Sequence, residues 1–424
     1  MKIIKYLIIS CCMALAFFFI IPSAFSYFRS STWIDTKTLL QTNYSYTAVK
    51  TNYRNTLAIS KNHDLYSWGV NYSGQLGNGT TNDILSPSKI NSLSNVVYVS
   101  TGLENALVLT ENGNVYGFGK NEDYVLGLNH SNVVTTPTLI NINGLKPNEK
   151  VIYVNCRIDS RSFFLTNLGN VFSCGSNIHY KAAQPDRFAV YTKPAKVNTS
   201  AVGTDKIVNI VLGEDQTFFL TVGGNVYFVG YNTDYAIGVP GASPSTSYST
   251  LTKHTKLNEF VNNEKIVSVK SDVNSTAYLT ISGRLVVCGS NDGYQLGVNT
   301  YSPVTTLTFA TLPSLGPNEK IIEVDIIVYN MAVLTNKYNI YMAGDRSYGQ
   351  TGDGVSYDPH IVLTKLNGIN YLNKEVPVQI SLGVLYTMIS TSKDRIVVFG
   401  NNEDGQLGLG YVSVCEDVPK YISL

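Results

Sequence analysis

One motif recurs seven times along this chain, and this repetition constrains the fold more than any other feature. The first copy is Leu65–Gly69, a strand-like segment ending in Trp-Gly, which is followed by Gly-Gln-Leu-Gly at residues 74–77. The related segments end at seven anchor glycines: Gly69, Gly119, Gly175, Gly230, Gly289, Gly344 and Gly400. Six copies carry a second glycine eight residues later: Gly77, Gly127, Gly238, Gly297, Gly352 and Gly408. Such a fixed period indicates an array of one structural unit.

Each repeat contains the pattern of four short strands. In the second copy these are residues 96–99, 106–110, 115–119 and 137–140, with the turn Glu111–Asn114 between two of them. Asn and Gly accept the positive φ that tight hairpin turns need. Four strands in about 50–59 residues are typical of a propeller blade, which must stack on its neighbours to bury its faces. The sequence therefore predicts an all-β, seven-bladed β-propeller over residues 47–424.

The two ends of the repeat region predict how the ring closes. Thr47–Val49 has the pattern of the strand that starts a blade, and Pro419–Ile422 that of the strand that finishes one. We expect these two segments to share one mixed blade. Deleting the last dozen residues should then collapse the stability of the ring.

The Trp-Gly strand followed by Gly-Gln-Leu-Gly resembles the regulator of chromosome condensation repeat. The resemblance covers residues 47–424, and its best copies are residues 68–79, 289–297 and 399–410. It implies a seven-bladed propeller, in agreement with the count of repeats. The copies are degenerate, because Asn, Arg or Gln stands where the family commonly has His. The best-known family member is a nucleotide exchange factor for a nuclear small GTPase, so exchange activity is one function that the resemblance implies.

The first 26 residues differ from the rest of the chain. Lys2 and Lys5 precede an uncharged, mostly apolar stretch that ends at Pro22, and Ala24–Ser26 provides small residues for cleavage. This pattern is typical of a secretory signal peptide. An uncleaved anchor, attaching the chain to a membrane through residues 6–25, is the alternative. With residues 27–46 as a leader segment, we expect a protein that is secreted or held at the extracellular face of the membrane.

Charge and cysteine usage limit the partners and cofactors. The chain has 31 Lys and Arg against 30 Asp and Glu, which argues against a nucleic-acid partner. No cysteines have the spacing of a zinc site, and Cys174 and Cys288 occupy the repeat position of Trp68, so we expect them in the core. Acidic clusters such as residues 401–405 fit ordinary turns better than a calcium loop. We expect no metal and no cofactor.

Four tyrosines form the most informative local pattern. They stand five residues after the anchor glycines of the second to fifth repeats: Tyr124, Tyr180, Tyr235 and Tyr294. Because equivalent positions lie at the same radius of a ring, these side chains are predicted to form an arc. Tyrosine is favoured at binding surfaces, since it combines a large contact area with a hydroxyl group. The alternative is that each ring packs on its own loop.

No motif for catalysis is present. The five histidines do not form a metal motif, and there is neither a Gly-x-Ser-x-Gly elbow nor a phosphate-binding glycine loop. The sequence therefore favours a monomeric, non-catalytic propeller, not an enzyme, that binds a protein partner. Two alternatives stay open: an exported lectin or enzyme that uses the channel or one face, and a guanine-nucleotide exchange factor for a small GTPase.

Overall fold

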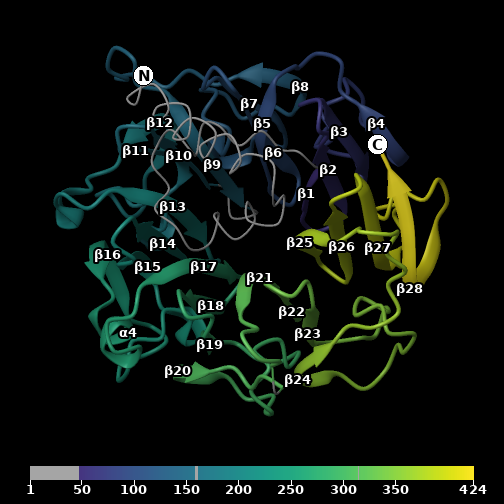
Figure 1. Cartoon of the computed structure of the whole chain (residues 1–424). Coiled ribbons are helices and arrows are strands. Elements are labelled where there is room, and N and C mark those ends of the chain that lie inside the picture. The colour runs from purple at the N-terminus through teal and green to yellow at the C-terminus, as the bar shows by residue number, and fades with distance from the viewer. Residues whose placement is uncertain (1–46, 158–160, 314) are drawn as a thin grey trace, which may run out of the picture.

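Seven four-stranded antiparallel sheets surround a central axis (Figure 1), in a computed structural model that describes residues 47–157, 161–313 and 315–424. Each sheet is built from four consecutive strands, ordered from the axis to the rim. The prediction of an all-β, seven-bladed propeller is confirmed. The predicted signal peptide or anchor (1–26) and leader segment (27–46) lie outside the described residues.

The blades share one strand plan. The innermost strands are β1 (Ala48–Thr51), β5 (Val96–Thr101), β9 (Val151–Arg157), β13 (Ile207–Leu212), β17 (Ile266–Asp272), β21 (Ile321–Ile327) and β25 (Pro377–Gly383). The second strands are β2 (Asn55–Ile59), β6 (Asn105–Thr110), β10 (Arg161–Thr166), β14 (Gln216–Thr221), β18 (Ser275–Thr280), β22 (Asn330–Thr335) and β26 (Tyr386–Thr391). The third strands are β3 (Leu65–Gly69), β7 (Val115–Gly119), β11 (Val171–Ser176), β15 (Val226–Tyr231), β19 (Leu285–Gly289), β23 (Ile340–Gly344) and β27 (Arg395–Asn402). The outermost strands are β4 (Ile84–Lys89), β8 (Val134–Leu139), β12 (Val190–Lys196), β16 (Ser247–Lys253), β20 (Val304–Phe309), β24 (His360–Lys365) and β28 (Ser413–Ser423).

Helical structure in the described residues is confined to short segments between strands. The 3₁₀ turns are η1 (Glu122–Tyr124), η2 (Ile178–Tyr180), η3 (Ser200–Val202) and η4 (Thr233–Tyr235), and the α-helix is α4 (Thr255–Phe260). Across the part of the chain that the structure describes, no helix has the length and apolar character needed to span a bilayer.

Apolar side chains between neighbouring blades form the core. The second strands are buried along their whole length, as in Asn105–Thr110. The anchor glycines allow the second and third strands to meet, because a Cβ on Gly119 would lie 2.2 Å from the Glu104 carbonyl oxygen. Their positive φ, 98° at Gly119, is also a conformation that other residues rarely adopt.

The second glycine of a repeat allows one blade to pack closely on the next. A Cβ on Gly77 would lie 2.9 Å from the Phe118 ring, and one on Gly127 would lie 2.9 Å from the Cys174 sulfur. The last repeat makes the same contact with the first blade, at the seam where the two ends of the ring meet, since a Cβ on Gly408 would lie 2.8 Å from Trp68 Nε1. Cys174 and Trp68 are fully buried, as their shared repeat position predicts.

The predicted closure by a mixed blade is wrong. Strand β1 lies in one sheet with β2, β3 and β4, while β28 lies in the sheet of β25, β26 and β27. Side chains close the ring instead. Gln379 accepts a hydrogen bond from the Val49 amide (3.1 Å) and donates one to the Val49 carbonyl (3.1 Å), and the Ser381 hydroxyl accepts one from the Thr51 amide (3.1 Å).

Candidate functional site

The loops of the propeller emerge on two faces. Because successive strands are antiparallel, the loops after the first and third strands of every blade lie on one face. The hairpin turns after the second strands, and the connections between blades, lie on the other. In the described residues, the loops of these two faces carry different charges.

One face is strongly acidic, and we call it the acidic face. Its loops hold fourteen carboxylates: Asp83, Glu104, Glu122, Asp123, Asp186, Glu214, Asp215, Asp234, Asp292, Asp345, Asp353, Asp358, Glu403 and Asp404. They hold five Lys and Arg residues: Arg54, Lys120, Lys181, Arg187 and Arg346. A surface with this surplus of one sign attracts basic partners and speeds their encounter.

The opposite face is nearly neutral, and several of its carboxylates form hydrogen bonds or ion pairs with residues of the blades. Glu319 accepts hydrogen bonds from the Thr335 hydroxyl (2.7 Å), the Asn339 amide (2.7 Å) and the Gly316 backbone (3.0 Å). Glu375 is similarly held by Arg395. Burial acts to raise the pKa of Glu375, but the Arg395 and Thr391 hydrogen bonds lower it to about 2. These carboxylates are held by hydrogen bonds and an ion pair within the fold, so the acidic face is the one with a clear surplus of charge.

Polar side chains of the innermost strands join the blades around the axis. Asn155 donates to the Ile210 carbonyl (2.9 Å), and Lys270 pairs with Asp325 (3.0 Å), whose other oxygen accepts from the Leu382 amide (2.9 Å). Burial lowers the pKa of Lys270, but Asp325 and Glu323 outweigh it and raise that pKa to about 12.

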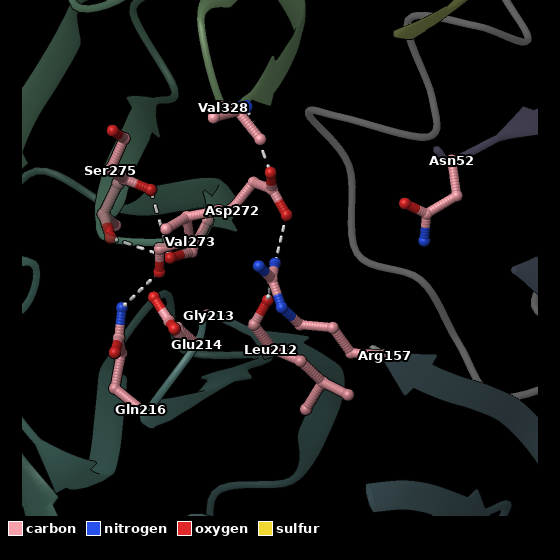
Figure 2. Close-up of polar contacts among 12 residues, drawn as sticks. Asn52, Arg157, Leu212, Gly213, Glu214, Gln216, Asp272, Val273, Ser275 and Val328 are labelled. Carbon is pink, nitrogen blue, oxygen red and sulfur yellow. Dashed lines mark hydrogen bonds and ion pairs between the residues drawn. The ribbon is translucent and has the colours of Figure 1, made fainter. Parts of the chain in front are cut away.

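An ion pair spans one blade at the acidic-face ends of these strands. Figure 2 shows the guanidinium of Arg157, on β9, pointing at the carboxylate of Asp272, on β17. Arg157 also donates to the Leu212 carbonyl of the intervening blade (3.4 Å), and Asp272 accepts from the Val328 amide (3.1 Å). These contacts thus join four successive blades at the acidic face.

Further out, side chains bridge neighbouring blades at several junctions of the acidic face. Arg54 of the first blade pairs with Asp404 of the last (3.4 Å). In the second blade, Lys120 pairs with Glu104 (3.1 Å), and Glu104 also accepts from the Tyr72 hydroxyl of the first blade. In each case a cation of the chain itself satisfies the carboxylate.

At the junction of the third and fourth blades, a histidine of the chain contacts the carboxylate. His179 Nδ1 lies 3.0 Å from Asp215 Oδ1, and its ring stacks on Tyr231 with centroids 4.7 Å apart. Thr233 donates to the other Asp215 oxygen (2.9 Å). Burial acts to raise the pKa of Asp215, but the hydrogen bonds from His179 and Thr233 hold it below its ordinary value.

The junction of the fifth and sixth blades is open. A shallow pocket of about 230 Å³ lies there, lined by Asp292, Gly293, Tyr294, Tyr329, Asp345 and Pro359. We call it the notch. Gly293 has no side chain to bridge the junction, and its Cα packs so closely on Tyr329 that an added Cβ would lie 3.0 Å from the ring. Two carboxylates and two phenol rings therefore face a hollow without a cation from the described residues.

The structure places the four predicted tyrosines at four different junctions. All are half-buried and have positive φ, from 58° at Tyr124 to 66° at Tyr235. The turns η1, η2 and η4 lie against the outermost strands of the following blades, β12, β16 and β20. The four side chains thus follow the rim of the acidic face, and only Tyr294 lines the pocket. Their role as a binding arc stays a prediction.

Sequence reasoning missed three residues of the notch: Asp292, Tyr329 and Asp345. Their side chains come from three separate loops, and nothing in one repeat shows that they meet. The available signal was Gly293, one position before the tyrosine, where other repeats have a side chain such as His179 or Asp404. A single missing side chain in a repeat array marks a place where a junction opens.

The comparisons with known proteins agree with the repeat pattern. Residues 62–109 and 112–156 match the repeat described as "Regulator of chromosome condensation (RCC1) repeat". A mouse protein named "RCC1-like G exchanging factor-like protein" is 27% identical over 275 residues, covering 62% of this chain. That match spans 56% of the mouse protein, so the chain covers little more than half of this relative's length.

Solved structures support the fold. Human WBSCR16 has a TM-score of 0.74 at 20% identity, with 85% of this chain and 94% of that chain covered. Prp20p from Saccharomyces cerevisiae, whose structure is titled with its binding properties to Gsp1p and histones, has a TM-score of 0.72 at 19% identity. That alignment covers 93% of this chain and 90% of that one.

These relatives correct one expectation. The sequence favoured a protein that is not an enzyme, and this is wrong, because the chain is related to proteins named as exchange factors, which accelerate a reaction. The absence of a hydrolytic or metal motif misled the prediction, since nucleotide exchange needs a binding surface and no such motif. The predicted resemblance to the regulator of chromosome condensation repeat is therefore confirmed, since residues 62–156 match that repeat and the seven blades have the fold of the solved relatives.

Proposed function

We propose that this protein is a guanine-nucleotide exchange factor for a small GTPase and acts through its acidic face. The observation that carries the proposal is the 275-residue match to the mouse RCC1-like G exchanging factor-like protein. The sequence predicts a protein partner, and in this proposal that partner is the small GTPase. The charge of the acidic face supplies the physical basis.

Nucleotide exchange requires that the factor stabilise the GTPase without its nucleotide. Small GTPases hold the phosphates with a glycine-rich loop, a lysine and Mg²⁺, so their nucleotide site is rich in positive charge once it is empty. Carboxylates such as Asp123 and Glu403, both exposed on the acidic face, can offset that charge. They also disfavour the return of the phosphates.

Rigidity supports the same proposal. The polar contacts between blades, such as Lys270 with Asp325 and Arg157 with Asp272, fix the acidic face before any partner arrives. A preorganised surface loses little conformational entropy when it binds, so more of the contact energy stabilises the complex. An exchange factor needs that energy to release a tightly held nucleotide.

The proposal places the propeller in the compartment of its GTPase. Residues 1–26 would then serve as something other than an export signal, since the GTPase must reach the acidic face. Export and exchange are thus alternatives that one observation separates. A tagged full-length chain should remain inside the cell with its GTPase, and recovery of the propeller only from the medium would contradict the proposal.

The direct test is release of fluorescent GDP from a panel of small GTPases that includes Gsp1p. Substoichiometric full-length protein should accelerate release from at least one member. Replacing two exposed carboxylates of the acidic face (D123N/E403Q) should lower the exchange rate about fivefold, with the loss greatest at low salt. The charge-matched variant of the opposite face, E111Q/E259Q, should keep the rate. No acceleration with any GTPase would reject the proposal.

A further inference from the structure

The notch between the fifth and sixth blades differs in charge from the junctions that resemble it. Asp292 follows its anchor glycine by three residues, the position that Tyr72 holds in the first blade. Asp345 follows its anchor glycine directly, the position of Lys120 in the second blade. The first junction therefore contains its own cation, and the notch has a carboxylate at that place.

The last junction gives the same comparison for a second position. Arg54 precedes the second strand of the first blade and pairs with Asp404, at 3.4 Å. The guanidinium of Arg54 also lies 5.9 Å from the Tyr53 ring centroid. Tyr329 holds the position of Arg54 in the sixth blade, and Gly293 holds the position of Asp404 in the fifth. The notch thus lacks the arginine that occupies the equivalent position at the junction of the last and first blades.

The carboxylate of Asp345 is fixed in place. The Ser347 backbone and hydroxyl donate to its Oδ1 (3.1 and 2.6 Å), and Gln350 donates to its Oδ2 (3.0 Å). Each oxygen retains acceptor capacity, because a carboxylate offers about four lone-pair sites. Across the notch, Asp292 is exposed and accepts from the Ser290 hydroxyl at 3.3 Å. Neither carboxylate has an ion-pair partner among the described residues.

The aromatic walls add a second kind of recognition. Tyr329 is 42% exposed, and the Tyr294 ring is braced by Tyr301 with centroids 6.3 Å apart. Tyrosine faces attract guanidinium and ammonium groups, and they also pack on the alkyl stem that carries such a group. A hollow of about 230 Å³ has room for one long side chain.

We propose that the notch binds an arginine or lysine side chain of a protein partner, with Asp292 and Asp345 pairing with the cation and Tyr294 and Tyr329 flanking it. The inference rests on the proposed function for the identity of the partner, which would be the GTPase. Arginine suits the site better than lysine, because its planar fork can donate to two carboxylates and stack on a ring at once.

The site can be tested without a partner. N-acetyl-arginine-N-methylamide is titrated into the full-length protein labelled with 3-fluorotyrosine, and the ¹⁹F resonances of Tyr294 and Tyr329 are assigned with Y294F and Y329F. Both resonances should shift saturably. D292N/D345N should weaken the affinity at least about tenfold, as expected when two charged partners are lost. The matched variant D123N/E403Q, which removes two charges from the same face, should change it less than about twofold.

A filled notch provides the second variant. Y329R places a guanidinium where Arg54 stands at the last junction, and this arginine should pair with Asp292 and abolish binding of the probe. Because Tyr329 is partly exposed, the substitution leaves the core intact. If the resonances do not move, or if D292N/D345N and D123N/E403Q lose the same affinity for the probe, the proposal that the notch binds a cationic side chain is overturned.

The outcome for the notch is separate from the outcome for the proposed function. If the probe binds and no GTPase in the panel is activated, the notch stands and exchange activity is rejected. If GDP release is accelerated and D292N/D345N loses no more activity than D123N/E403Q, exchange stands and the notch is overturned. With both correct, D292N/D345N should raise the KM for the GTPase about tenfold while kcat changes less.

Discussion

At the scale of single residues, the repeat depends on positions with positive φ. The second glycine of the motif has such a conformation in six blades, and Ala183 adopts it in the third, with φ 57°. The pattern of glycines could be read from the sequence, because each one answers a local backbone requirement. That Ala183 keeps the same geometry could not, because alanine rarely adopts a positive φ.

Exchanging these residues should change stability in opposite directions. Ala183→Gly should raise the free energy of unfolding by about 1 kcal/mol, because an L-residue is strained in this conformation. Gly127→Ala should lower the free energy of unfolding by about 2–4 kcal/mol, because the new Cβ would lie 2.8 Å from the Pro194 ring and 2.9 Å from the Cys174 sulfur. Urea unfolding of the two variants checks both signs. A less stable Ala183→Gly protein would contradict the first.

The tyrosines carry a similar strain for a different reason. Tyr124, Tyr180 and Tyr235 have positive φ where other blades have a glycine, such as Gly74 with φ 72°. Strained residues of this kind persist mainly where they serve a function. Replacing all three with glycine should change the free energy of unfolding by less than about 1 kcal/mol, because relief of strain offsets lost packing. The exchange rate should fall severalfold, and an unchanged rate would end the hypothesis of a binding arc.

At the scale of elements, strands were easier to predict than the loops that decide function. The strand residues form short, mostly apolar runs between clear turn signals, so all four strands of a repeat can be recognised. The notch was missed because Asp292, Tyr329 and Asp345 are brought together by blade packing, which no local pattern encodes. The rim position of Tyr294 follows from the repeat, whereas its pocket does not.

The helix α4 gives a prediction about pH. His254 caps it by accepting a hydrogen bond from the Leu257 amide at Nδ1 (3.1 Å), while Nε2 lies 2.8 Å from the Ile237 carbonyl and donates to it. Burial, which outweighs these contacts, lowers the pKa of His254 to about 4. The unfolded chain, with an ordinary pKa of about 6.5, therefore binds the proton more readily.

Stability should consequently fall as the pH drops from about 6.5 to about 4, by up to about 3 kcal/mol. Above pH 6.5 this contribution is fully present. Urea unfolding between pH 4 and 8 measures the slope, and His254→Asn, which keeps a capping group and does not titrate, should show a flatter curve. An identical slope in both proteins would assign the pH dependence to other groups.

At the scale of the whole molecule, the number of blades was predictable and their closure was not. Counting repeats needs only the sequence, but the partner of β28 depends on which sheet edge is free once the ring has formed. The first and last blades meet through Gln379 and Ser381, and through Trp68 against Gly408. The seam is therefore held by the same kind of contact as the junction of the first and second blades, where Gly77 packs on Phe118.

Gln379→Leu should test the strength of this seam. It leaves the amide and the carbonyl of Val49 without their partner in a buried position, so the free energy of unfolding should fall by about 2–4 kcal/mol. Ser86→Ala, on the exposed outermost strand of the first blade, should change it by less than about 0.5 kcal/mol. Equal effects of the two substitutions would show that Gln379 does not hold the ring shut.

Each blade is built from four consecutive strands, and no blade is shared between the two ends of the chain. The chain could therefore begin at any blade without dividing a sheet. Strand β28 finishes on the same face on which β1 starts, as at every other passage from one blade to the next. A circular permutant that links residue 424 to residue 47 and opens the loop at residues 198–206 would keep every sheet whole. Such a permutant would carry its new ends on the nearly neutral face, away from the surface that we propose meets the GTPase.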